Sequence, residues 1–117
     1  MVIEWDKNAK NDLKEYVKLS KTSTAKEYAK KLSTYVRNLA EYPNLGKIQY
    51  IYNNSEIRQL IFKMHRIYYR IKDNKIIIIA VLHTNVDIAK ITQYLKGLTY
   101  WFIFFVFSTN YDKIWTV

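Results

Sequence analysis

Basic and apolar residues alternate along the segment from Arg66 to Lys72. In an extended chain, Ile67, Tyr69 and Ile71 face one side, and the other side carries Arg66, Tyr68, Arg70 and Lys72. Arginine offers planar, bidentate donors to a phosphate, and a neighbouring aromatic ring can stack on a base. The pattern predicts a sheet face suited to a polyanion, although an ordinary solvated strand face has the same composition.

The preceding segment adds further cations to this region. Ile57 and Ile61 alternate there with Arg58, and we expect Arg58 to join the basic face if the strand register allows it. The candidate target-binding residues are therefore Arg58, Lys63, Arg66, Tyr68, Arg70 and Lys72.

Two histidines could transfer protons near neutral pH. His83 ends an apolar run, and His65 lies beside a predicted hairpin connection, where packing or capping is the alternative role. The carboxylates show no paired spacing, and metalloprotease, phosphate-loop and serine-hydrolase motifs are absent. Without cysteine and with only two histidines, the sequence predicts neither a metal site nor a cofactor.

Length and charge limit the functional classes. A chain of 117 residues is expected to form a single domain, and 50% hydrophobic residues exclude a disordered chain. The formal net charge of +9 points to nucleic acid, the ribosome, an acidic protein or an anionic membrane as partner, or only to solubility.

The elements that must position these residues can be read from periodicity. We expect a strand over 2–5, helices beginning after Asp6 and at a capping box from Thr24 to Glu27, and strands over 48–52, 56–63, 66–72 and 76–82. Asp73-Asn74 predicts a hairpin, and residues 87–95 a short helix. The predicted fold is α+β, with an N-terminal strand and a helical hairpin packed on one face of a small antiparallel, mixed-edge β-sheet.

The segment 98–107 is almost entirely apolar. It is too short for a stable membrane span. Self-association or packing on the domain through 98–107, insertion into a membrane interface and a neutral translational extension are the alternatives.

Several motifs occur in an order that resembles the RelE/ParE superfamily of type II toxins, in its ParE-like, plasmid-stabilisation branch. They include Ile3-Glu4-Trp5-Asp6, the strand from His65 to Ile71, and the segment from Leu82 to Ile91. The resemblance implies a cytoplasmic bacterial toxin domain over 1–95, followed by an atypical extension over 96–117. It also implies a cognate antitoxin that wraps the toxin surface.

Two activities occur in the superfamily. ParE-like members inhibit DNA gyrase, whereas RelE-like members cleave mRNA on the ribosome without a metal. Arg66 matches a RelE-like arginine near the scissile phosphate, so the catalytic candidates under that alternative are Arg66, Arg58 and His83. RelE-like enzymes carry another basic residue after the last strand, where this chain has Thr84 to Asp87 without Lys or Arg. This difference favours gyrase as target, and a degenerate, non-toxic basic binding module is a third possibility.

Overall fold

The computed structural model describes residues 1–52, 55–87 and 93. Its contacts divide the chain into two compact units, Met1–Asn85 and Val86–Val117. The first unit contains, in chain order, β1 (Val2–Trp5), α1 (Lys7–Ser20), α2 (Ser23–Val36), the 3₁₀ turn η1 (Arg37–Ala40), β2 (Lys47–Tyr52), β3 (Ser55–Phe62), β4 (His65–Lys72) and β5 (Lys75–His83).

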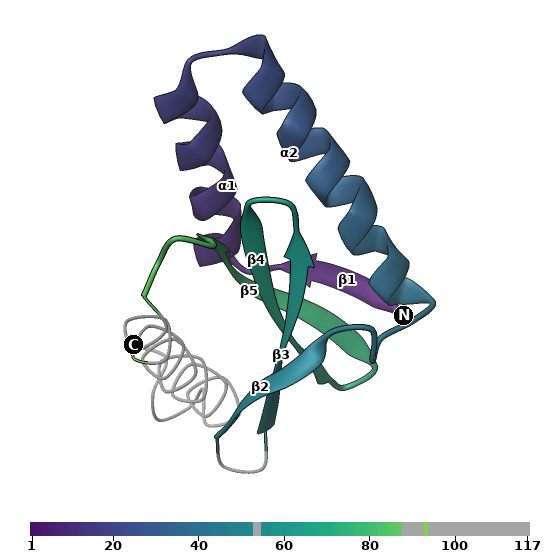
Figure 1. Cartoon of the computed structure of the whole chain (residues 1–117). Helices are drawn as coiled ribbons and strands as arrows, with labels where there is room; N and C mark the ends of the chain where they lie inside the picture. The colour runs from purple at the N-terminus through teal and green to yellow at the C-terminus, as the bar shows by residue number, and fades with distance from the viewer. Residues whose placement is uncertain (53–54, 88–92, 94–117) are drawn as a thin grey trace, which may run out of the picture. The chain divides into compact units, whose positions relative to one another are not determined.

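The five strands form one sheet in the order β1-β5-β4-β3-β2 (Figure 1). Neighbouring strands are antiparallel except at one edge, where β1 runs parallel to β5 and Ile3 is paired with Ile76. The predicted α+β class and mixed-edge sheet are therefore confirmed. The connection from β4 to β5 is the predicted hairpin, in which Asp73 and Asn74 have positive φ angles of 51° and 63°.

Local side-chain hydrogen bonds define where the helices begin. Asp6 caps α1, since its carboxylate accepts the Asn8 N–H at 3.2 Å. The predicted cap of the second helix at Thr24 is wrong, because Thr22 caps α2 and its Oγ1 accepts the Ala25 N–H at 3.1 Å. Thr22 has the extended backbone of an N-cap residue, and the helix begins at Ser23. Thr24 therefore already lies inside the helix.

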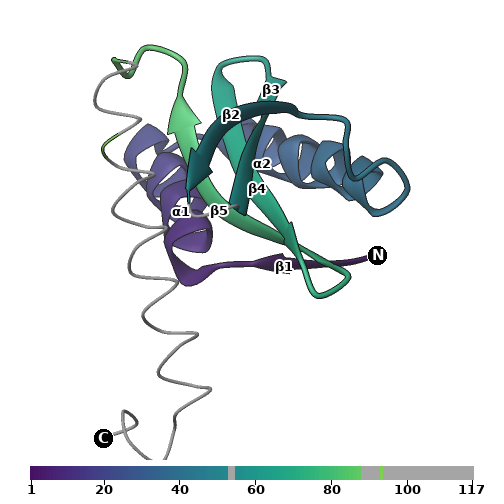
Figure 2. The ribbon, with the colours of Figure 1, turned by 90° about the horizontal axis from the view of Figure 1, so that it is seen from below.

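The helical hairpin lies on one face of the sheet, as Figures 1 and 2 show. Its apolar stripe packs against the odd-numbered residues of β4, which confirms the predicted strand parity. The fully buried residues of this core include Ala9, Leu32, Val36, Leu39, Ile67, Tyr69, Ile76 and Ile78. Burial of apolar surface contributes about 25 cal/mol per Å², so this layer stabilises the fold.

Some predicted features lie outside the described residues. These are nearly all of the predicted helix over 87–95 and the apolar segment 98–107. Within the described part of the chain, no helix combines the length and hydropathy of a membrane-spanning segment.

Candidate functional site

The face of the sheet opposite the helices carries a small polar network. The Arg66 guanidinium donates to Gln59 Oε1 at 3.2 Å, and the Tyr68 hydroxyl donates to the same oxygen at 2.8 Å. Tyr68 is buried, and this burial raises its pKa, although the nearby Arg66 opposes the shift. Arg66 is half-buried and keeps partial access to solvent.

The remaining predicted cations do not form one exposed row. Arg70 is only 7% exposed, and burial lowers the pKa of its guanidinium against the opposing charge of Asp73. Lys72 is half-buried. Lys63 lies in the β3–β4 turn, with its ammonium 5.5 Å from the centre of the Phe62 ring. The six predicted target-binding residues are thus distributed over several environments.

Arg58 belongs to the other face of the sheet. It is paired with Tyr69 and shares the parity of Leu60, so the expectation that it joins Arg66 is wrong. Its guanidinium donates to the Gly46 carbonyl at 2.8 Å and forms an ion pair with Glu56 at 3.3 Å. Arg58 therefore fastens the loop before β2 to the sheet.

Tyr69 holds the same loop from inside the core. Its hydroxyl donates to the Pro43 carbonyl at 2.7 Å and accepts the Gly46 N–H at 2.8 Å. A Cβ atom built on Gly46 would lie 2.7 Å from Tyr69 Cε1 and 2.8 Å from the Gln59 carbonyl oxygen. The loop can approach the sheet this closely only because residue 46 has no side chain.

His65 and His83 lie together on the helix-covered face, in an aromatic cluster with Tyr16 and Tyr28. The two imidazole centres are 5.5 Å apart, and Tyr28 Oη is 2.8 Å from His65 Nδ1. Tyr28 Oη also accepts the Met64 N–H at 3.3 Å. His65 is 4% exposed, and burial together with the neighbouring His83 lowers its pKa. This environment favours a neutral, packed imidazole.

Asp12 links α1 to the sheet. Its Oδ2 accepts the Val81 N–H at 2.9 Å, directly after the irregular register of β5. Burial raises its pKa from 3.8 to about 6, and nearby Asp6 adds to the shift, whereas the hydrogen bond from Val81 opposes it. In the folded protein, the Asp12 carboxyl group therefore changes its protonation state at about pH 6.

We expect Asp12→Asn to stabilise the protein at pH 7, because the amide keeps an acceptor for Val81 and removes a partly buried charge. The wild-type carboxyl has a higher pKa folded than unfolded. Its protonation therefore stabilises the fold below pH 4, and this contribution is lost as pH rises to about 6. Urea unfolding of both proteins from pH 4 to 7 measures the difference. An advantage of the variant that stays constant over this range would contradict the assignment.

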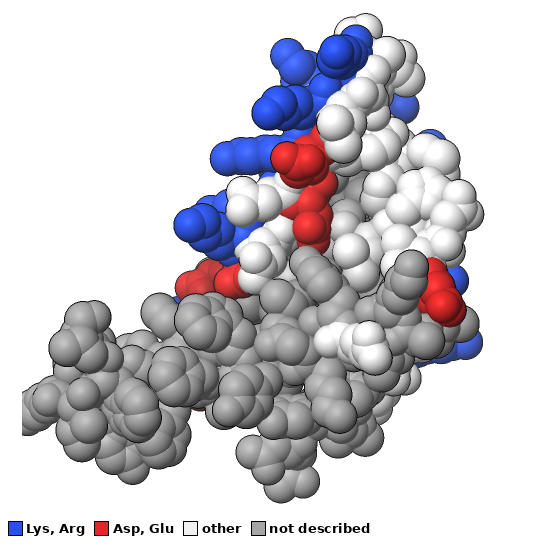
Figure 3. All heavy atoms as spheres, turned by 90° about the vertical axis from the view of Figure 1, so that its left-hand side faces the viewer, with Lys and Arg blue, Asp and Glu red and all other residues white. Residues whose placement is uncertain are grey.

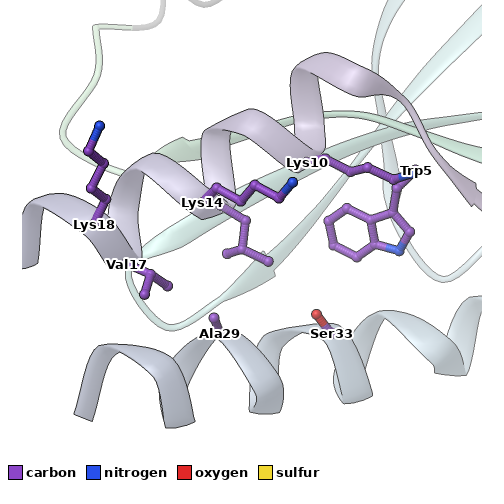
Figure 4. A pocket seen from close by; sticks show the side chains of 8 residues that line it. Trp5, Lys10, Lys14, Val17, Lys18, Ala29 and Ser33 are labelled. Carbon is purple, nitrogen blue, oxygen red and sulfur yellow. The ribbon is translucent and has the colours of Figure 1, made fainter. Parts of the chain in front are cut away.

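A groove between α1 and α2 was not anticipated from the sequence. It contains a hollow of about 440 Å³ whose apolar lining comes from Trp5, Leu13, Val17 and Ala29 (Figure 4). A second hollow of about 370 Å³ shares Leu13, Ala29 and Ser33 and continues the groove along α2. Small side chains at Ala29 and Ser33, one helical turn apart, create its depth.

Cations border this groove on both helices. The lining of the first hollow includes three lysines of α1, namely Lys10, Lys14 and Lys18. Lys30 and Arg37 line the second hollow from the side of α2 and η1. An apolar floor with positive rims is suited to an amphipathic, acidic helix, whose apolar side would be buried and whose carboxylates would meet the lysines.

The comparisons with known proteins identify the family. Residues 3–88 match the family described as ParE toxin of type II toxin-antitoxin system, parDE. The chain belongs to the ParE toxin family. Searched against curated proteins, the sequence has no match. The ParE match begins at the second residue of β1 and extends past β5, so it covers both helices and all of the described sheet except Val2.

Membership of the ParE toxin family confirms the RelE/ParE resemblance and implies a cognate antitoxin as partner. The residues that line the groove of this ParE toxin come from 5–37, within the matched range. The sequence indicates only the rim of the groove on α1, because the lysines of this helix recur every three or four residues and so lie on one side of it. The depth of the groove depends on how the two helices pack, which periodicity does not give.

Proposed function

We propose that this ParE-family toxin inhibits DNA gyrase and that its antitoxin neutralises it by docking in the groove between α1 and α2. The choice of gyrase as the target rests on one observation, namely that the arginines of the sheet are bound or buried within the fold. Arg58 is bound to the loop at Gly46, Arg66 is hydrogen-bonded to Gln59, and Arg70 is buried. Basic side chains engaged in this way support a protein-binding inhibitor better than a nuclease.

Cleavage of RNA by the alternative, RelE-like mechanism requires cations that stabilise charge on the scissile phosphate and a group that moves protons. His65 is buried and its pKa is lowered. The backbone N–H of Asn85 donates to His83 Nδ1 at 3.0 Å, which occupies one ring nitrogen. The segment from Thr84 to Asp87 contributes no cation.

Arg66 is the residue that supports the alternative. Its side chain retains partial solvent access, but its Nε atom is buried and has no hydrogen-bond partner in the described part of the chain. A phosphate would therefore be bound by the terminal guanidinium nitrogens, one of which donates to Gln59. Ribosome-dependent mRNA cleavage led by Arg66 is therefore the second candidate function.

The test combines gyrase and mRNA assays. We expect the purified protein to inhibit DNA supercoiling by gyrase, and we expect Arg66→Gln to keep at least half of the inhibition. Growth arrest on induction should be accompanied by DNA-damage signalling. Unaffected gyrase together with codon-positioned mRNA cuts that disappear in Arg66→Gln would establish the alternative instead. Arg37→Gln provides a control for the loss of charge in these assays, which contain no antitoxin, because Arg37 is exposed and lies in the groove between the helices rather than on the sheet.

The antitoxin part of the proposal is supported by charge and shape. A segment with apolar residues every three or four positions could bury them against Leu13, Val17 and Ala29. Acidic residues on its flanks would meet Lys10 and Lys14 on one rim and Lys30 on the other. Complementary charge of this kind speeds association and selects the partner more than it adds affinity.

A further inference from the structure

The lysines of α1 form an uninterrupted row. At 100° per residue, Lys7, Lys10, Lys14 and Lys18 fall within about 80° of one another around the helix axis. All four side chains are exposed. The acidic residues of α1, Asp12 and Glu15, point to other sectors of the helix. Figure 3 shows basic side chains gathered along one margin of this face of the molecule, with acidic ones beside them.

The row has the length of a nucleic-acid contact. From Lys7 to Lys18 the helix rises about 17 Å at 1.5 Å per residue. Consecutive phosphates of one DNA strand are about 3.4 Å apart along the duplex axis, so the row spans roughly five of them. Lys21, which caps α1, extends the positive charge by a further turn.

The side chains around the row indicate which nucleic acid fits. Single-stranded DNA and RNA are bound on aromatic platforms that stack the bases. The sector of α1 that holds the lysines is bordered by Asn11 on one side and Val17 on the other, and it contains no aromatic residue. Trp5 lines the adjoining hollow with Lys10 and Lys14, but its ring is half-buried and packs against the core. Contacts would therefore go to phosphates alone, without reading the base sequence.

We propose that the lysine row of α1 binds the phosphate backbone of duplex DNA without sequence specificity. This contact does not depend on the proposed inhibition of gyrase. It shares Lys10, Lys14 and Lys18 with the rim of the groove, so a docked antitoxin would compete with DNA for them. Such binding would concentrate the toxin on DNA, where a sliding or hopping protein encounters DNA-bound partners more often. It would also weaken steeply with salt, because each bound phosphate releases condensed counterions.

Fluorescence anisotropy with a 24-base-pair duplex, from 50 to 200 mM KCl, tests the proposal. We expect a log–log salt slope of about −3 to −4, as four phosphate contacts require. The double variant Lys14→Gln/Lys18→Gln should reduce the slope by about 2 and weaken binding by about tenfold or more at the lowest salt. Single-stranded DNA of the same sequence should bind more weakly.

The matched control is Lys31→Gln/Lys47→Gln, which removes the same charge from exposed positions elsewhere. Lys31 lies about 200° around α2 from Ala29 and therefore faces away from the groove. Equal slopes for the two double variants would overturn the proposal, because binding would then follow net charge alone. Tighter binding to single strands, or binding only to vesicles of phosphatidylglycerol, would also overturn it. Circular dichroism confirms that each variant is folded.

Discussion

Replacing Gly46 with alanine is expected to lower the free energy of unfolding by roughly 2–4 kcal/mol. The new methyl group would overlap Tyr69 and the Gln59 carbonyl oxygen, at 2.7 and 2.8 Å. Backbone and a buried ring meet at this point, so neither neighbour can move away easily. If the loop shifts instead, the hydrogen bonds from Gly46 N–H and Arg58 are lost together.

Thermal and urea unfolding measure this effect. A loss of this size corresponds to a melting temperature about 10 °C lower or more for a domain of this length. Asn44→Ala is the matched control, because Asn44 is exposed in the same loop and its contact to Arg58 uses only the backbone carbonyl. A Gly46→Ala protein as stable as the control would show that the loop does not need the close approach to Tyr69.

Filling the groove should separate toxicity from neutralisation. Ala29→Trp places an indole in the hollow of about 440 Å³ between α1 and α2. An antitoxin helix seated there would lose its central apolar contact, which typically contributes about 2–4 kcal/mol. We therefore expect binding to weaken by about 30-fold to 1,000-fold, while growth inhibition by the toxin alone is unchanged.

Co-expression with the antitoxin tests this expectation. Cells that carry Ala29→Trp should stop growing even when the antitoxin is supplied. Lys31→Trp, which adds the same ring on the far side of α2, should still be rescued. Full rescue of Ala29→Trp would place the antitoxin elsewhere on the toxin. A second variant, Ser33→Trp, fills the same groove from another position, so agreement between the two variants excludes a local rearrangement at position 29 as the cause. Thermal unfolding shows whether each protein is folded.

Local patterns in the sequence were sufficient to predict most of the strands, helices and core residues of the fold. Apolar runs, β-branched composition and, in the middle strands, alternation of apolar and polar residues predicted each strand within about one residue. Asp73-Asn74 predicted the hairpin that the positive φ angles confirm. Parity also placed Ile67 and Tyr69 in the core correctly. These features depend on residues that are neighbours in the chain, where backbone sterics and periodicity decide the structure.

The details that depend on distant residues could not be read in this way. Arg58 has the parity of Leu60, but only the loop around Gly46 explains what its guanidinium binds. The raised pKa of Asp12 follows from its burial between α1 and the sheet, where its carboxylate meets Val81, a residue distant in the chain. The groove depends on the distance between two helices. The catalytic roles of Arg66 and His83 stay predictions.

The parallel pairing of β1 with β5 has a consequence for the newly made chain. Val2 is paired with Lys75, so the first strand has no neighbour in the sheet until the last strand has been synthesised. At about 5–20 residues per second, this interval is roughly 4–15 s. During that time the helical hairpin can form locally, but its apolar side has no completed sheet to cover it. The nascent toxin therefore passes through a period in which a chaperone, or an antitoxin already present, can bind it before it becomes active.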